Sequence, residues 1–224
     1  MSCEKEVIYD YDQEHYTAAN FQSCEIEQCP DLSIDFFRLQ EPSVLANVVN
    51  DKVQLFLESN LSSGATQEKE LIPMIENYLN DAQTAYPEDS VFSGTHEIII
   101  DIAVTYQSNE LFSMIEYAYK FDGGAHGFER LQYSNFDPRT GQVLNNKDCI
   151  QDAEGFLAFA KAEFQKKYPN ASVSFEDYFK FQKANIGYSQ EGLVIYEKMP
   201  VELFDLPEIE LTLPWEEVRD FLSF

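Results

Sequence analysis

The stretch Asp122-Gly123-Gly124-Ala125-His126-Gly127 holds one of the three histidines of the chain beside an aspartate and three glycines. Glycines let backbone amides approach a ligand closely, and His126 or Asp122 could then line that ligand. The same residues are equally typical of a turn that joins two strands. We favour the turn and keep a binding role for its tip. The candidate contacts are Gly123, Gly124, His126, Gly127, Phe128 and Tyr133.

Catalytic and metal-binding motifs of known spacing are absent from the sequence. His15, His96 and His126 form no HxxH or HxxxH pair, and no EF-hand spacing occurs. The patterns GxSxG, GxGxxG and GxxxxGK[ST] are absent as well. Pairs of acids arise by chance in a chain with 40 Asp and Glu residues. We therefore predict no catalytic residue, no metal site and no cofactor. A hydrolase that uses an acidic pair, His126 or a Cys/His arrangement is the alternative left open, and a structural spacer is a third.

Three of the four cysteines fall in the folded part of the sequence. Cys24 and Cys29 bracket the sequence EIEQ, and this spacing could close a small disulfide loop in an oxidising compartment. Cys149 precedes the apolar Ile150. We expect it to be a small buried hydrophobic residue, as free cysteines often are.

Composition and charge restrict the classes of partner. The chain has 224 residues with 44% hydrophobic residues, which indicates a folded globular protein. Its net charge of −25 repels phosphate backbones and anionic membranes, so neither nucleic acid nor a membrane surface is expected as a partner. The charge favours a basic or a neutral partner instead. No run of about 18 apolar residues is present to span a bilayer.

The hydrophobic periodicity predicts an α+β fold in which helices pack on an antiparallel sheet meander. Residues 1–14 are charged and are expected to form a tether. Strands are expected at 16–27, 32–39, 96–107, 111–121, 128–136, 183–188, 192–197 and 208–213. Helices are expected from 43 to 61, from 71 to 82, from 153 to 168 with Asp152 as N-cap, and after Pro214.

The order of these motifs resembles the RsiV-like family of extracytoplasmic bacterial domains. The matching residues are Gly123, Gly124, His126, Gly127, Asp137, Thr140, Gly141, Asp148, Gly192, Leu193, Val194, Ile195, Tyr196, Pro214 and Val218. The preceding region, about 30–120, is similar to the companion domain found in PdaC-type peptidoglycan deacetylases. The deacetylase chemistry of those proteins belongs to a separate domain with metal-binding histidines, which nothing here matches.

The resemblance implies a domain organisation and a place in the cell. It implies a tether and first strand at 1–29, a PdaC-type lobe at 30–122 and an RsiV-like lobe at 123–224. It also implies an extracytoplasmic domain of the bacterial envelope. Cys3 follows a small residue, as at the start of a mature lipoprotein, so it is the candidate lipidation site and a lipid anchor the only membrane attachment.

The function expected from the residues and the resemblance together is non-enzymatic binding. In the RsiV-like family the corresponding domain is a receptor for lysozyme, a basic protein, and a strongly acidic chain suits such a partner. The expected partner is therefore a basic protein or a cell-wall glycan. The sequence leaves the oligomeric state open.

Overall fold

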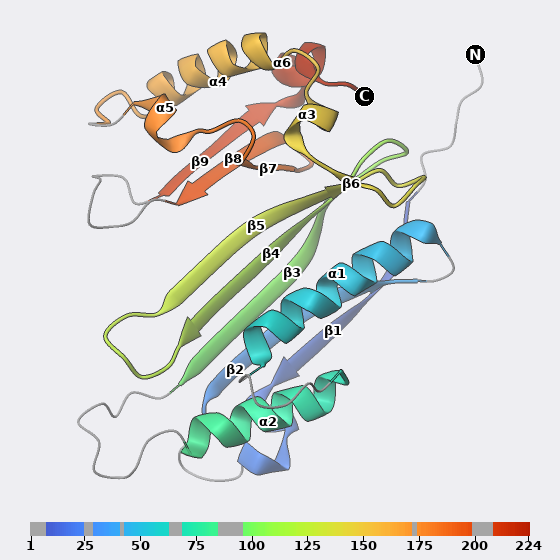
Figure 1. The fold of residues 1–224 in the computed structure, drawn as a ribbon, viewed down its shortest axis with the longest axis vertical. Helices are drawn as coiled ribbons and strands as arrows, with labels where there is room; N and C mark the ends of the chain where they lie inside the picture. The colour runs from blue at the N-terminus through green and yellow to red at the C-terminus, as the bar shows by residue number, and fades with distance from the viewer. Residues whose placement is uncertain are drawn as a thin grey trace. The chain divides into compact units, whose positions relative to one another are not determined.

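The computed structural model describes residues 8–24, 29–40, 43–62, 69–84, 96–171, 174–198 and 208–224. Its strands are β1 (Tyr11–Thr17), β2 (Asp31–Leu39), β3 (Glu97–Gln107), β4 (Phe112–Phe121), β5 (Phe128–Phe136), β6 (Val143–Leu144), β7 (Asn185–Tyr188), β8 (Gly192–Lys198) and β9 (Glu208–Pro214). Its α-helices are α1 (Val44–Leu61), α2 (Leu71–Thr84), α3 (Asn146–Cys149), α4 (Ala153–Lys167), α5 (Phe175–Tyr178) and α6 (Trp215–Val218). The predicted α+β class is confirmed (Figure 1).

The chain divides into two compact units that interrupt each other in the sequence. The N-terminal unit comprises Tyr9–Ala103 and Glu116–Leu131, and the C-terminal unit includes Val104–Ile115 and Gln132–Phe224. Strands β3, β4 and β5 therefore each contribute residues to both units. The lobes expected from the sequence, 30–122 and 123–224, are continuous segments, whereas these units are not.

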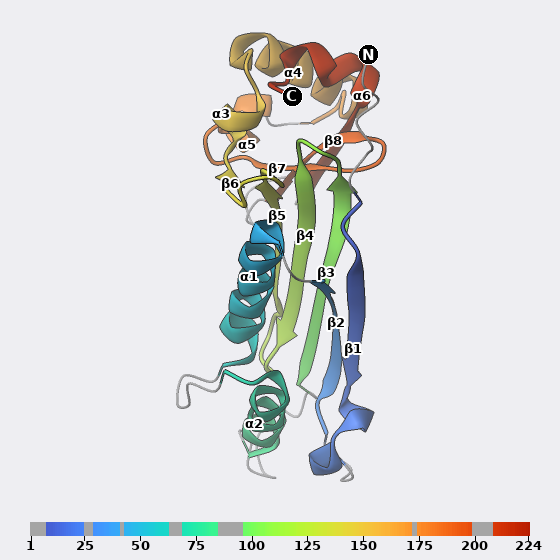
Figure 2. The same cartoon turned by 90° about the vertical axis from the view of Figure 1, so that its right-hand side faces the viewer.

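The larger sheet has the strand order β1-β2-β3-β4-β5-β6. The successive neighbours β3, β4 and β5 form the expected meander. β2 and β3 run parallel, with Ile34 opposite Ile100. A parallel neighbour needs a long crossover connection, and α1 and α2 lie in that connection. Figure 2 shows both helices on the same side of the strands. Within the N-terminal unit no described helix covers the opposite face, which we call the open face.

Apolar alternation on the strands and an apolar stripe on α1 build the core of the N-terminal unit. On β2 the side chains of Leu32, Ile34 and Phe36 are buried. The buried residues of α1 recur at helical spacing and are Leu45, Ala46, Val49, Val53, Phe56, Leu57 and Leu61. The helix begins as predicted, since the Ser43 Oγ accepts a hydrogen bond of 2.9 Å from the Ala46 N–H.

The C-terminal unit has a second sheet of three strands, ordered β7-β8-β9, with α4 along one side (Figure 1). Aromatic rings fill its core: Phe156 lies 6.4 Å from Phe179, and Phe175 stacks on Phe179 at 4.9 Å between ring centroids. The predicted N-cap of α4 is confirmed, because the Asp152 carboxylate accepts a 2.9 Å bond from the Gly155 N–H.

A buried polar network ties β7 to the ends of β4 and β5 inside the C-terminal unit. The Ser113 hydroxyl donates to Asn135 Oδ1 at 2.8 Å, and Asn135 Nδ2 donates to the Ile186 carbonyl at 2.8 Å. The Tyr188 N–H donates to Ser113 Oγ at 3.2 Å. Because unsatisfied buried polar groups are costly, this network fixes the position of β7.

Two expectations for the N-terminal residues are wrong. The first strand begins at Tyr11, within the expected tether, and ends at Thr17. Residues 18–20 and 22–24 form 3-10 turns where a strand to 27 was expected. β1 is an edge strand whose side chains are mostly exposed, so it lacks the apolar alternation that marks a strand in a sequence.

No helix in the described part of the chain combines the length and apolar character that a bilayer span requires.

Candidate binding face and its loop

The glycine loop joins β4 to β5, and its glycines have distinct structural roles. Gly123 has a φ of 74°, a conformation that L-residues with side chains rarely adopt. Gly127 leaves room for an aromatic ring, because a Cβ there would lie 2.5 Å from Cε2 of Tyr119. A Cβ on Gly124 would meet no atom within 4 Å. The loop is thus a turn shaped around Tyr119, with an open position at Gly124.

Asp122, at the start of the loop, has cationic and polar neighbours in the same unit. Its Oδ1 lies 3.5 Å from Lys120 Nζ and 3.7 Å from His96 Nδ1. Burial and the Asp122 charge raise the pKa of the Tyr78 hydroxyl on α2. These contacts hold the base of the loop in place.

The six candidate contacts predicted around this loop do not form one patch. His126 and Phe128 are exposed, Phe128 by 65%, and His126 has no hydrogen bond or ion pair within the described residues. Tyr133 lies five residues along β5 from Phe128, about 16 Å away at the rise of a strand.

Tyr133 belongs to the C-terminal unit and is packed there. Its N–H donates to Asn185 Oδ1 at 2.8 Å. Its ring lies against the backbone of Gly187, where a Cβ would be 2.0 Å from Tyr133 Cδ1. Burial, followed by the charge of Glu210, raises the pKa of its hydroxyl. Tyr133 on β5 therefore packs against β7.

Alternation decides which side chains occupy the open face of the N-terminal unit. Glu116 is fully buried on the helix side, with Lys52 Nζ of α1 3.7 Å from its carboxylate. Arg130 is also on that side, its guanidinium 5.5 Å from the ring centroid of Phe56. Their neighbours on β4 and β5, Tyr117 and Glu129, consequently point to the open face.

Two tyrosines and two glutamates lie together on this face. Tyr117 hydrogen-bonds Glu129, and its pKa is raised first by burial and then by the charge of Glu129, with Tyr119 and Glu97 adding smaller effects. We call Glu97, Tyr117, Tyr119 and Glu129 the tyrosine–glutamate cluster. It joins three strands and meets the glycine loop through Tyr119.

A second row of polar side chains crosses the same face on β1, β2 and β3. His15 stands opposite Asp35, and Asp35 stands opposite Asp101. His15 Nδ1 lies 2.7 Å from Asp35 Oδ1. Burial and the neighbouring Asp35 raise the pKa of the Asp101 carboxyl. Asp31 and Glu97, also opposite one another, add two more carboxylates.

The row does not form a nucleophilic triad. The Ser33 hydroxyl donates to Asp35 at 3.4 Å, so the carboxylate stands between the serine and the histidine. A triad needs the histidine between the other two groups. Among the described residues, no three His, Cys, Asp or Glu side chains gather as metal ligands would.

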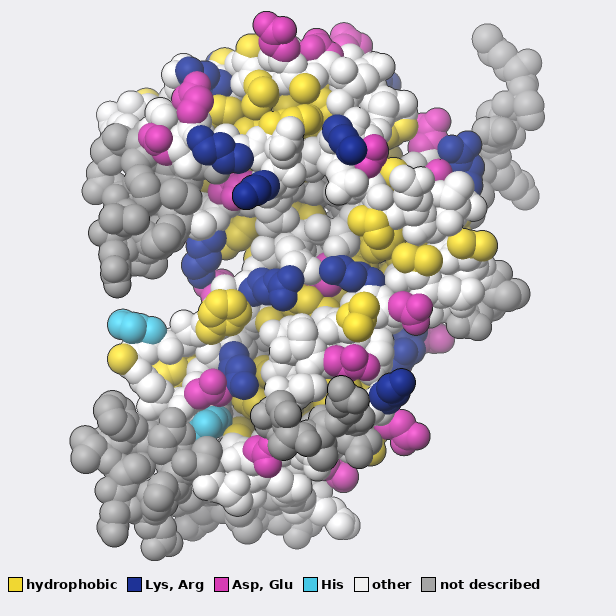
Figure 3. All heavy atoms as spheres, in the orientation of Figure 1, with side chains coloured by type: hydrophobic (Ala, Val, Ile, Leu, Met, Phe, Trp, Pro, Cys, Tyr) yellow, Lys and Arg dark blue, Asp and Glu magenta, His cyan; other side chains and the backbone are white. Residues whose placement is uncertain are grey.

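The charge of the chain is concentrated in the N-terminal unit, whose sequence holds 21 acidic and 5 basic residues. On the side that carries α1, Figure 3 shows acidic and basic side chains interspersed. The open-face residues named above instead include five carboxylates, at Asp31, Asp35, Glu97, Asp101 and Glu129, and no Lys or Arg.

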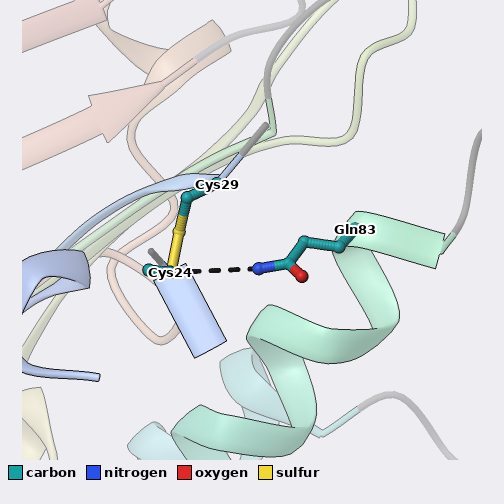
Figure 4. Close-up of a disulfide and its surroundings, with 3 residues drawn as sticks. All are labelled: Cys24, Cys29 and Gln83. Carbon is teal, nitrogen blue, oxygen red and sulfur yellow. Dashed lines mark hydrogen bonds between the residues drawn. A yellow bond between two sulfur atoms is a disulfide. The ribbon is translucent and has the colours of Figure 1, made fainter. Parts of the chain in front are cut away.

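The cysteines have structural positions. Cys24 and Cys29 form a disulfide with their Cα atoms 5.1 Å apart, and Gln83 Nε2 of α2 lies 4.0 Å from Cys24 Sγ (Figure 4). Cys149 is buried as predicted, and burial raises its pKa to about 11, which keeps the thiol protonated at neutral pH. Cys3 lies outside the described residues.

The open face was not predicted from the sequence, although two signals of it are present in the strands. Asp101 interrupts the apolar run EIIIDIAV, and tyrosines alternate in EYAYKF. Both are signals of a strand face that is only partly covered. The assignment of these residues to one surface, however, depends on strand order and register.

One family model matches part of the chain. Residues 33–129 match the family model for deacetylase PdaC, which covers less than half of the chain. No curated protein matches the sequence.

Two solved structures share the fold of nearly the whole chain. One is a DUF3298 family protein from Pseudomonas aeruginosa PAO1, with 16% identity, a TM-score of 0.62, and coverage of 97% of this chain and 95% of that one. The other is a member of the DUF3298 family from Bacteroides fragilis NCTC 9343, with 15% identity, a TM-score of 0.62, and coverage of 97% and 94%. At these identities the likeness is one of fold.

Proposed function

We propose that the chain is the non-enzymatic ectodomain of a lipid-anchored bacterial envelope protein, and that its open sheet face binds a basic protein. The similarity to PdaC over 33–129 and the DUF3298 fold support an extracytoplasmic domain. The RsiV-like resemblance supports a protein ligand of the lysozyme type. Cys3 remains the proposed lipidation site.

The observation that carries the binding proposal is the pairing of tyrosine rings with carboxylates on an open sheet face. Lys and Arg side chains can make two kinds of interaction with such a surface. Their charge attracts Glu97 and Glu129, and they can form cation–π contacts with Tyr117 and Tyr119. The rings also offer apolar area with little entropy to lose on binding. The net charge of the unit adds electrostatic attraction during approach.

Hydrolysis by an acidic pair is the second candidate, and one observation favours it. Asp35 and Asp101 are neighbours, and the pKa of Asp101 is raised, as in a carboxyl that serves as general acid. Asp101 is exposed on the open face, however, and a general acid of this kind is normally sheltered in a cleft. Release of sugar reducing ends from peptidoglycan by the wild type, lost in Asp101→Asn, would establish this second function.

The binding proposal is tested by calorimetry with lysozyme as the basic protein. We expect binding that weakens steeply between about 50 and 300 mM salt, because exposed charges are screened over roughly 10 Å at 0.1 M. The double variant Glu97→Gln/Glu129→Gln should weaken binding about tenfold, and Tyr119→Leu should weaken it by a similar factor.

The matched control places the same loss of two charges on the helices. The control is the double variant Asp51→Asn/Asp81→Asn, because Asp51 on α1 and Asp81 on α2 are both exposed. It should reduce affinity far less than the open-face pair. Equal losses in both double variants, or no binding of lysozyme at low salt, would contradict the proposal.

A further inference from the structure

A pocket in the C-terminal unit has no place in the binding proposal above. It has a volume of about 420 Å³ and is lined by Asn145, Asn146, Lys147, Phe181 and Gln182. This volume lies within the range of pockets that take small molecules. The described lining residues supply amides, one ammonium group and one aromatic ring, and none of these five residues carries a carboxylate. That lining contrasts with a chain whose net charge is −25.

Asn146 holds the two segments of the pocket together. Its Nδ2 donates to the carbonyls of Phe181 at 2.6 Å and Ala184 at 3.0 Å. Both N–H groups of the amide are therefore used, and Oδ1 has no partner in the described part of the chain. Asn146 thus offers a fixed acceptor from a wall that is already ordered before a ligand binds.

Lys147 and Gln182 supply groups that are still available. Both side chains are exposed, and neither makes a hydrogen bond or an ion pair within the described residues. Asp148 is the nearest acid in sequence, and its Oδ2 accepts bonds from the backbone and side-chain N–H groups of Asn145, at 2.9 and 3.1 Å. The Lys147 charge also attracts Asp148, but the ammonium makes no direct bond to that carboxylate, so it can still bind an anion.

Phe181 forms the apolar part of the lining. Its ring centroid lies 6.5 Å from that of Phe156, a fully buried residue of the core. The ring is only partly buried, so it is held in place from behind and still borders the pocket. Aromatic rings beside amides suit sugars, whose C–H faces pack on a ring while hydroxyls bond to amide groups.

We propose that this pocket binds a sugar acid, with Lys147 on the carboxylate, Asn146 and Gln182 on hydroxyls and Phe181 under the sugar ring. The cation selects for a charged sugar, since the charge-assisted hydrogen bond is lost when the carboxylate is absent. The proposal does not depend on the open face of the N-terminal unit.

The test titrates the whole chain, followed by NMR, with galacturonate and glucuronate against galactose and glucose, their neutral counterparts. We expect at least one acid to bind about tenfold tighter than its neutral counterpart. Acetate, a bare carboxylate, should bind more weakly than that acid. Short oligogalacturonates serve to identify the source: tighter binding than the monomer assigns an acid within a glycan chain, and equal binding assigns a free sugar acid.

Lys147→Met should abolish the preference for the acid, and Phe181→Leu should weaken binding of acid and neutral sugar alike. The control is Lys183→Met, which removes the same charge from an exposed residue that does not line the pocket. The proposal is overturned if neither acid binds, if acetate binds as tightly as the sugar acids, or if Lys183→Met loses as much affinity as Lys147→Met.

Discussion

The sheets of the two units are covered to different extents. In the N-terminal unit, α1 and α2 lie on one face of a broad sheet, and tyrosines and carboxylates occupy the other. In the C-terminal unit, the central strand β8 is buried along almost its whole length, from Gly192 to Tyr196. The N-terminal unit thus presents a broad polar face, and the C-terminal unit carries the pocket lined by Lys147 and Phe181.

Glycine and tyrosine also pack against each other in different settings in the two units. Tyr119 rests on Gly127 at the half-exposed open face, whereas Tyr133 rests on Gly187 within a buried strand. The same close approach of a ring to a backbone shapes a turn in one case and fixes strand packing in the other. The face and the pocket proposed above as binding sites lie in the same two units as these two arrangements.

The largest expected effect is on stability, when each of these two glycines is replaced by alanine. Gly187→Ala places a Cβ 2.0 Å from the Tyr133 ring in a buried strand, and we expect a loss of about 3 kcal/mol in the free energy of unfolding. Gly127→Ala meets Tyr119, whose ring is partly exposed and free to move away, so the loss should be about 1 kcal/mol.

Urea denaturation measures both losses. Gly124→Ala is the control, since its Cβ meets nothing within 4 Å, and it should change stability by no more than about 0.5 kcal/mol. Equal losses in Gly187→Ala and Gly127→Ala would remove the distinction drawn between a buried and an open packing site.

Removal of the disulfide should affect the N-terminal unit selectively. Cys24 and Cys29 are separated by 5 positions, and a loop this short restricts the unfolded chain by about 2 kcal/mol. We expect the double variant Cys24→Ser/Cys29→Ser to lower protection from amide hydrogen exchange in β1, β2 and α2. Exchange in β8 should be unchanged, and equal loss in both units would contradict a local role.

The smallest expected effect concerns Asp101 and depends on pH. Its folded-state pKa is raised, so folding favours the protonated form, and ionisation disfavours the folded state as the pH rises above 3.8. Asp101→Asn should therefore stabilise the folded state at pH 7 and raise the melting temperature. Because the site is exposed, the gain in the free energy of unfolding should be less than about 1 kcal/mol.

That gain should vanish as the pH is lowered through the folded pKa toward 3.8, where the wild-type carboxyl also becomes neutral. Thermal melts of both proteins between pH 3 and pH 8 give the comparison. A gain that is constant with pH would show that the charge of Asp101 is not its cause.

Much of the secondary structure followed from short-range patterns. The helix that begins near Ser43, the Asp152 cap of α4 and the buried Cys149 were all predicted from neighbouring residues. Sequence patterns predict such features because a helix face or a cap involves residues three or four apart.

The four-residue helices α3 and α5 were missed, as was the start of β1. Each of the helices is barely one turn long, too short for a periodic pattern to appear. The parallel pairing of β2 with β3 was missed as well, because it joins residues about 65 positions apart.

By itself, the sequence determined the fold class, the acidic charge and the turn nature of the Gly123–Gly127 loop. Composition, periodicity and glycine chemistry act locally, so they can be read without coordinates. Only the tertiary structure decided that Glu97, Tyr117 and Glu129 share a face, and that Lys147 and Phe181 line one pocket. Strand register and chain packing bring together residues that are distant in sequence, and no local pattern encodes that proximity.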